Sequence, residues 1–592
     1  MANRPLITLL LLLMSLYTSA QNSSLSGTVR NSQNEGIPLV TVSFQNAAQT
    51  AITNEEGHYS IQELNPGNYS VLYSYPGFKT ITSEINLQAG EERILNIRME
   101  EDYKLLEEII ITSNRRVETL DEVPSSVSVL SSRQIETLSL TSNSVSDIMN
   151  EVPGLALSTS QTSNTGQTLR GRNMLVLIDG IPQSTPLRNG NRDINTIDPN
   201  VIERIEVIKG ATAIYGNGAD GGIINYITKK PLSYKGFEST TELSSGISLV
   251  DPDHSLSSKL SQTFSGKTGK LGYVANGSFK QTGVFRDAKG EIVSPSYGLG
   301  ETDQYNLFGK LNYQINPDHS LEFMYNYFSS NQDTEYINQP GVYGIRPAIG
   351  VIGEDPGVDQ GNRYNHNGQF TYNAYNLIRN TDFNLNLYFQ DFQTIYAFSP
   401  FFYNEETGYT GGQSMIESDK KGARVNFKTP YSIGREFSGD ILYGVDILND
   451  VTSQYLVDGR LWVPEVAMSN FAPYAQLKSL YKDFVLKAGI RLENINIDIP
   501  DYTTIYIVPN GGTPQGNVAV EGGELKYNAT TFNAGLRYNR WEQFKPFVSF
   551  SQSFSIADLG RTLRSATEST IGTISSEAVI ASNYEAGFNT YL

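Results

Sequence analysis

The sequence feature that most constrains the fold is an alternation of apolar and polar residues that begins after Leu232 and continues through the rest of the chain. Within 305–315, the odd positions hold apolar residues or glycine, and the even positions are mostly polar. Successive side chains of a β-strand point to opposite faces, so this period predicts strands with one apolar face and one polar face. The runs 321–327, 383–389 and 484–492 repeat the pattern. Soluble β-sandwiches also contain such strands, so alternation alone does not decide the class.

The lengths of the connections favour a membrane barrel. We predict about fourteen strands in this region, joined on one side by short turns. These turns lie near 266–270, 316–319, 432–436, 481–483 and 540–543. The long polar loops between them span roughly 286–302, 332–362, 394–416, 452–469, 497–523 and 556–582. Short turns on one side and long loops on the other are typical of bacterial outer-membrane barrels. The predicted fold class is therefore mainly β, with a large antiparallel transmembrane β-barrel.

The N-terminus reads as a secretory signal peptide over residues 1–20. Arg4 precedes the apolar run 6–16, and the small residue Ala20 precedes the expected cleavage point. This run has only about half of the roughly 20 apolar residues that a membrane-spanning helix needs. No later stretch approaches such a helix, so a mature chain in a membrane must cross it with strands.

Composition argues against several classes of function. The chain has 44 basic and 62 acidic residues, a net charge of −18, whereas nucleic-acid binding needs a basic surface. It has no cysteine, which removes disulfides and thiol catalysis. Its four histidines show no metal-ligand spacing, and no nucleophile–base set is evident. We therefore predict no enzyme, no cofactor, no metal site and no nucleic-acid partner.

Residues 21–101 alternate short β-prone runs with Gly, Asn and Pro, which predicts a small β-sandwich. The motifs are GTV (27–29), GIP (36–38), TNEEGHY (53–59) and LNPGNY (64–69). They resemble the carboxypeptidase-regulatory-like domain that precedes many receptors of Bacteroidetes. Despite its name, that module is not a peptidase.

The segment 102–118 contains a short apolar run between charged and polar residues. An exposed strand of this kind can add to the edge of a partner's sheet. By composition and position the run resembles a TonB box, whose residues here are Glu107, Glu108, Ile109, Ile110, Ile111 and Thr112. The alternative is that this run forms the last strand of the sandwich.

Residues 119–232 carry the most specific pattern. TLRGRN, LVLIDGIPQ and IERIEVIKGATAIYGNGADGGIINYITKKP follow one another in order. They are similar to the signature of the plug domain of TonB-dependent outer-membrane receptors: an Arg-Gly strand, an IDG turn, a Glu-Val-x-basic-Gly strand, a YG helix and a Gly-Gly-hydrophobic-Asn strand. The resemblance implies a small α+β plug inside a barrel that occupies 233–592.

The resemblance also implies a function. Receptors of this family import a scarce ligand without covalent chemistry, and the TonB–ExbB–ExbD complex of the inner membrane supplies the energy. A ferric siderophore or similar chelate is the favoured ligand, and outer-membrane lipid surrounds the barrel. The alternatives are import of glycans or peptides, a ligand-sensing signal-transducing receptor, or a structural barrel.

Two sets of candidate site residues follow. In the family, basic plug residues pair with a glutamate of the barrel wall, which by motif implies a plug–barrel latch of Arg170, Lys209 and Glu585. Cations and aromatic rings suit an anionic chelate. The loop and plug residues of these types that we expect to bind ligand are Arg188, Arg192, Tyr343, Arg346, Phe401, Phe402 and Tyr403.

The resemblance finally concerns chain length. Receptors with this plug use about twenty-two strands, which enclose a lumen wide enough for it. The expected count of about fourteen implies that the full-length gene encodes about eight more strands, on the order of 150 to 250 residues.

Overall fold

The computed structural model describes residues 23–590, apart from 101–109, 157–166, 184–195 and further gaps of one to five residues. The expected signal peptide, 1–20, lies outside the described residues. The chain divides into two compact units, Met1–Ile110 and Ile111–Leu592. We describe each unit by itself.

The first unit is a β-sandwich, as predicted. One sheet has the order β4-β1-β7, with β8 also paired to β1, and the other has the order β3-β2-β5-β6. The strands are β1 (Ser23–Arg30), β2 (Thr41–Phe44), β3 (Thr50–Ile52), β4 (His58–Leu64), β5 (Gly67–Ser74), β6 (Ile81–Leu87), β7 (Glu92–Ile94) and β8 (Ile97–Arg98). Inside it, the hydroxyl groups of Tyr59 and Tyr73 lie 2.7 Å apart, and Tyr59 donates to the carbonyl of Leu95.

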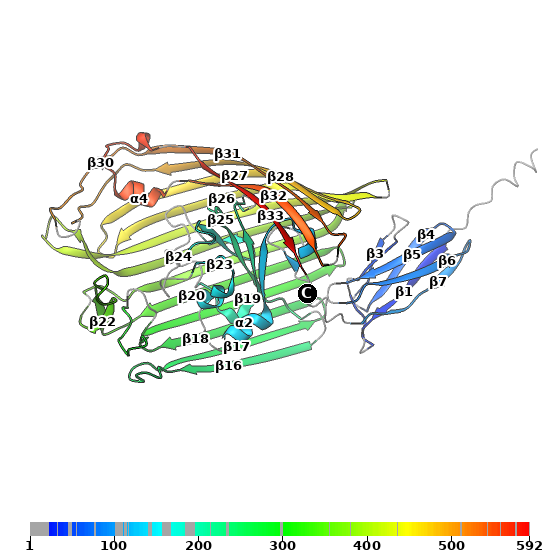
Figure 1. Cartoon of the computed structure of the whole chain (residues 1–592), viewed down its shortest axis with the longest axis horizontal. Coiled ribbons are helices and arrows are strands. Elements are labelled where there is room, and N and C mark those ends of the chain that lie inside the picture. The colour runs from blue at the N-terminus through cyan, green and yellow to red at the C-terminus, as the bar shows by residue number, and fades with distance from the viewer. Residues whose placement is uncertain are drawn as a thin grey trace, which may run out of the picture. The chain divides into compact units, whose positions relative to one another are not determined.

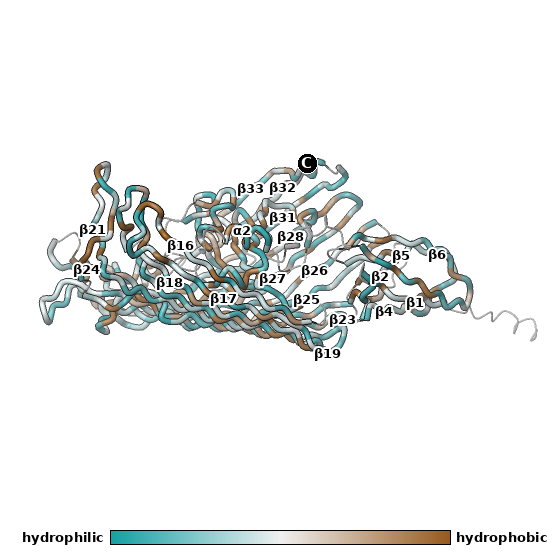
Figure 2. The backbone as a smooth tube through the Cα atoms, turned by 90° about the horizontal axis from the view of Figure 1, so that it is seen from below, coloured by the Kyte–Doolittle hydropathy of each residue, from teal (hydrophilic) through white to brown (hydrophobic). Residues whose placement is uncertain are grey.

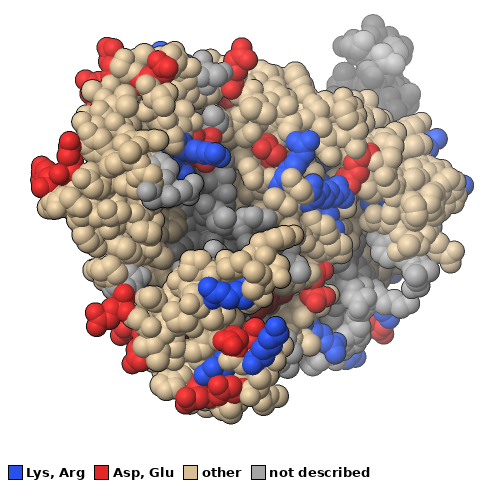
Figure 3. All heavy atoms as spheres, turned by 60° about the vertical axis from the view of Figure 1, so that its left-hand side comes forward, with Lys and Arg blue, Asp and Glu red and all other residues tan. Residues whose placement is uncertain are grey.

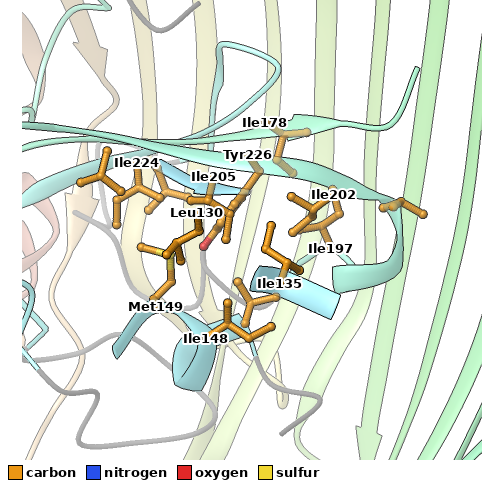
Figure 4. Packing of buried hydrophobic residues seen from close by; sticks show 14 of the residues in the cluster. Leu130, Ile135, Ile148, Met149, Ile178, Ile197, Ile202, Ile205, Ile224 and Tyr226 are labelled. Carbon is orange, nitrogen blue, oxygen red and sulfur yellow. The ribbon is translucent and has the colours of Figure 1, made fainter. Parts of the chain in front are cut away.

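The second unit begins with the predicted plug. Its sheet has the order β11-β14-β15-β12-β13. The elements are β11 (Val127–Ser131), α2 (Ser132–Ser139), α3 (Val145–Ile148), β12 (Met174–Ile178), β13 (Ile181–Pro182), β14 (Ile202–Lys209) and β15 (Gly222–Thr228). All residues of β12 and β15 are buried, which is why both read as continuous apolar runs. Figure 4 shows Ile135 and Ile148 of the helices packed against Ile202, Ile205 and Tyr226 of the sheet.

One plug element differs from the expectation. The resemblance implied a helix at Tyr215, but the described residues 215–220 form turns. Gly216 and Gly218 have φ values of 100° and 93°, in the left-handed region that glycine adopts without strain. The glycines therefore build a loop that places Tyr215 toward the wall.

The rest of the unit is one antiparallel sheet of fourteen strands, which confirms the predicted number (Figure 1). We call it the wall. Its strands, in order, are β16 (Gly236–Gly246), β17 (Ser257–Thr268), β18 (Leu271–Thr282), β19 (Thr302–Asn316), β20 (His319–Gln332), β23 (Gly361–Ile378), β24 (Thr381–Tyr403), β25 (Thr410–Ile433), β26 (Phe437–Leu456), β27 (Leu461–Tyr481), β28 (Phe484–Ile499), β31 (Gly523–Tyr538), β32 (Lys545–Ser555) and β33 (Val579–Asn589).

The wall curves, and the plug lies on its concave side (Figure 2). The two faces follow the predicted parity: Leu307, Leu311 and Phe323 are 45–56% exposed on the outside, whereas Lys310 and Asn326 are buried on the inside. The outer face is thus apolar and the inner face polar. No described helix is long and apolar enough to span a membrane.

Two predicted loops are largely strand. β24 extends to Tyr403 and β25 begins at Thr410, so most of 394–416 continues the sheet. Similarly, only four residues separate β26 from β27, where we expected the loop 452–469. The loops that remain hold β21 (Tyr336–Gln339), β22 (Ile349–Ile352), β29 (Tyr502–Thr503), β30 (Ala519–Val520) and α4 (Leu559–Arg564).

Candidate functional site

A buried ion pair fixes the start of the plug to the wall. The guanidinium of Arg115, three residues after the expected TonB box, donates to both carboxylate oxygens of Asp446 on β26, at 2.8 and 2.5 Å. The same guanidinium lies between two rings, 4.7 Å from the centre of Tyr215 in the plug and 4.6 Å from that of Tyr474 on β27. Two-pronged geometry and two aromatic faces are what distinguish arginine from lysine as a partner. We call this arrangement the Arg115 anchor.

The anchor is electrostatically matched although it is buried. The side chains of Arg115 and Asp446 are only 4% and 8% exposed. Burial opposes the charge of Arg115, but the adjacent Asp446 outweighs it, so the pKa of Arg115 lies well above its ordinary value. Asp446 also accepts from Arg491 at 2.7 Å. Because Asp446 has a second cationic partner, the loss of Arg115 and the loss of Asp446 have unequal consequences.

An acidic stretch after the anchor docks on a row of wall cations. Glu118 binds Lys487 of β28 at 2.5 Å, Glu122 binds Lys478 of β27 at 2.6 Å, and Asp121 binds Arg537 of β31 at 2.9 Å. Asp121 also pairs with Lys545 of β32. Four strands therefore hold three acidic residues of the plug's entry segment, which spans 118–122.

The structure brings together two of the three expected latch residues. Arg170 donates to Glu585 of β33 at 3.1 Å, and the backbone amide of Ser126 donates to the same carboxylate at 3.1 Å. Lys209 forms no ion pair with any described residue. Burial and the nearby charge of Arg170, only partly offset by Glu585, lower the pKa of Lys209. Within the described residues, Arg170 is thus the one cation that forms an ion pair with Glu585.

Little of the expected TonB box is described. Only the backbone of Ile110 and Ile111 is placed, as strand β9 (Ile110–Ile111), which pairs with β10 (Glu118–Thr119). Glu107, Glu108, Ile109 and Thr112 lie outside the described residues. The strand character expected for this run is present where the chain is described.

The ligand-binding candidates fall into three groups. Arg188 and Arg192 lie outside the described residues. Tyr343 is fully exposed, and the exposed Arg346 pairs with Gln339, both in the β21–β22 hairpin. The prediction of a loop at Phe401, Phe402 and Tyr403 is wrong, because these residues end strand β24. Phe402 is only 2% exposed, since its ring packs on Trp462, so it supports the mouth and does not present a free surface.

The structure adds residues that the sequence did not single out. The guanidinium of Arg564, on α4, lies 5.0 Å from the ring centre of Trp462, which contacts Phe402 in turn. Figure 3 shows Lys and Arg side chains gathered around the hollow at the loop end of the wall. A cavity of about 860 Å³ lies beside it, between the 332–360 loop and β24–β25. Its size suits a small-molecule ligand. No local sequence pattern links Trp462 to Arg564, because about a hundred residues separate them.

The comparisons with known proteins agree with this geometry. Residues 119–223 match the TonB-dependent Receptor Plug Domain, and residues 312–592 match the TonB dependent receptor-like, beta-barrel family. Residues 24–100 match the Carboxypeptidase regulatory-like domain. The chain has the domains of a TonB-dependent receptor. These domains and the apolar outer face of the wall identify the chain as an outer-membrane protein.

The similar proteins are receptors of the same architecture. The rhizobactin receptor of Rhizobium meliloti (strain 1021) is 28% identical over 494 residues, 76% of this chain and 64% of that protein. The ferric aerobactin receptor of Klebsiella pneumoniae is 24% identical over 77% of this chain and 65% of that protein. The chain therefore spans just under two thirds of the length of these relatives. The siderophore receptor PiuA from Acinetobacter baumannii shares the fold, with a TM-score of 0.58 at 14% identity over 80% of this chain and 70% of that one.

Proposed function

We propose that this receptor imports a ferric siderophore across the outer membrane, with energy from the TonB–ExbB–ExbD complex. The observation that carries the proposal is the Arg115 anchor. It joins a β-prone segment to the interior of the wall through one buried ion pair, 2.5–2.8 Å long. A pull on that segment from the periplasm loads the anchor first, because no other described ion pair lies nearer to it.

The choice of ligand rests on the mouth of the wall and on the relatives. Arg564 over Trp462, with further cations around the hollow, suits an oxygen-rich anionic chelate. Two similar proteins are named as receptors for rhizobactin and ferric aerobactin. The N-terminal sandwich supports a Bacteroidetes origin, because that domain precedes many receptors of that group.

The test is to delete residues 107–112 in the native gene and measure radiolabelled ferric siderophore. Binding at the cell surface should persist, because the mouth is unchanged, whereas uptake should be lost because the strand that pairs with TonB is absent. Ile110→Pro should also abolish uptake, since proline removes a backbone donor, and Ile110→Val should not. Uptake at the parental rate after the deletion would show that the segment is not the coupling site.

A further inference from the structure

The inner face of the wall carries a column of carboxamide side chains on neighbouring strands. At one level, Asn326 of β20, Asn367 of β23 and Gln390 of β24 are cross-strand partners. At a second level, Asn373, Asn384 and Asn426 of β23, β24 and β25 are partners in the same way. Gln369 and Asn386 lie between the two levels. We call these eight residues the amide ladder.

The plug touches β20 and β24 through uncharged groups. Gln390 donates to the side-chain oxygen of Gln183 at 2.8 Å, and Asn326 donates to the carbonyl of Thr196 at 3.0 Å. Among the described residues, no ion pair joins the plug to β20, β23 or β24. On β25, by contrast, the cations Lys420 and Arg424 donate to the plug carbonyls of Pro182 and Gly180. Neutral hydrogen bonds separate at lower cost than charge-assisted ones, so the plug and the wall part most readily along β20, β23 and β24.

Elsewhere the plug is held to the wall by charge. Ion pairs reach β26, β27, β28, β31, β32 and β33 from the entry segment and from Arg170. Asp220 adds a hydrogen bond to Ser553 of β32, at 2.8 Å. Ion pairs also reach β17 and β19, where Lys259 binds Asp198 at 3.2 Å and Lys310 binds Asp179 at 2.9 Å. Ion pairs of the plug with the wall therefore flank β20, β23 and β24 on both sides.

Several ladder groups have no hydrogen-bond partner among the described residues. They are the carbonyl oxygens of Asn367, Gln369 and Asn386, all buried. A buried acceptor without a donor is unfavourable, so such groups are uncommon and call for a role. Three such oxygens in one column can accept hydrogen bonds from a passing solute. These bonds replace the ones that the solute loses when it leaves water.

The ladder lies between two cavities. The cavity of about 860 Å³ at the mouth is lined by Gln332 and Gln360, on the loop side of β20 and β23. A second cavity, of about 310 Å³, is lined by Asn373, Asn384, Asn386 and Asn426 at the other end of the ladder. Carboxamides both donate and accept hydrogen bonds and add no charge. The smaller cavity is also lined by the charged residues Arg115, Asp179, Asp382, Arg424 and Lys428. Carboxamides with charged groups at one end suit an oxygen-rich solute.

We propose that the ligand crosses this receptor between the plug and the amide ladder, while the plug stays attached to β31–β33. This inference rests on the import function proposed above. It names the face of the wall that lines the path and the chemistry that carries the solute along it.

The experiment uses pairs of cysteines, which are unambiguous because the chain has none. The first pair, Gln183→Cys with Gln390→Cys, ties the plug to the ladder. The control pair, Asp220→Cys with Ser553→Cys, ties the plug to β32. Both are introduced into the native gene and joined in cells by a short bifunctional thiosulfonate, which a reducing agent reverses. Cross-link yield is read by gel shift, and surface binding of ferric siderophore reports that each variant is folded.

We expect the ladder cross-link to lower siderophore uptake at least tenfold, with recovery on reduction, and the control cross-link to leave uptake unchanged. A block by both cross-links would overturn the proposal, because the whole plug would then have to move. Uptake that continues through the ladder cross-link would overturn it as well. A second ladder pair, Thr196→Cys with Asn326→Cys, replaces the first if that one does not fold. Failure of the proposed function is distinct, since the receptor without any cysteine would then take up no siderophore.

Discussion

The Arg115 anchor predicts an asymmetry between its two partners. In Arg115→Ala, Asp446 keeps Arg491 as a partner at 2.7 Å, so no charge is left buried alone. In Asp446→Asn, Arg115 loses its carboxylate while it stays buried beside Arg491. Loss of one partner from a buried pair costs about 3–5 kcal/mol when the other charge is stranded. When a partner remains, the loss is nearer the roughly 1.5–3 kcal/mol of a hydrogen bond to a charged group.

These energies set the expected exchange rates. Each 1.4 kcal/mol is about a factor of ten in the opening equilibrium of the entry segment. Amide hydrogen exchange of residues 110–122, followed by mass spectrometry in outer-membrane vesicles, should therefore speed up about 10- to 100-fold in Arg115→Ala. It should speed up by about 100-fold or more in Asp446→Asn. Arg564→Ala, at the mouth, is the control and should leave this segment unchanged. Equal effects of the two substitutions, or a larger effect of Arg115→Ala, would refute the reasoning that only Asp446→Asn leaves a buried charge without its partner.

Two further predictions concern folding. Gly222→Ala should destabilise the plug by about 3 kcal/mol or more, because its Cβ would lie 2.1 Å from the carbonyl oxygen of Ile208. Gly218 also has a positive φ but faces open space, so Gly218→Ala should destabilise the plug by only about 1–2 kcal/mol. Thermal unfolding of the two variants tests this difference. Burial, helped by the hydrogen bond with Tyr59, raises the pKa of Tyr73 far above its ordinary value. The unfolded tyrosine ionises above pH 10 and the folded one does not, so the sandwich should lose about 1.4 kcal/mol per pH unit above 10. Tyr73→Phe should reduce this slope in denaturant titrations, and an unchanged slope would contradict the assignment.

The wall was the part of the fold most open to prediction. Its outer face meets lipid and its inner face meets polar plug residues, so the sequence must keep period two through every strand. Strand ends were harder to place. β24 and β25 continue beyond the expected loop boundary, where register shifts between Ile395 and Phe398 and between Ser399 and Tyr403 interrupt the two-residue alternation.

The candidate site, too, was predictable only in part. Arg170 and Glu585 could be proposed because their motifs resemble those of the family, and the structure places them 3.1 Å apart. The anchor had no such signal. Arg115 is one cation in a polar linker, and Asp446 is one polar residue in an alternating strand. Their partnership depends on the curvature of the wall, which brings residues 331 positions apart into contact. Such contacts are set by tertiary structure and leave no local trace.

The order of strands in the sandwich bears on when it can fold. β1 pairs with β4 on one side and, in parallel, with β7 and β8 on the other, so its sheet is complete only when Ile97 and Arg98 are available. Pairings this distant in sequence form slowly. A chain that is threaded through the inner membrane from its N-terminus would thus deliver nearly the whole domain before its first strand is locked between its neighbours. The topology thus postpones completion of this sheet until nearly the whole domain is available.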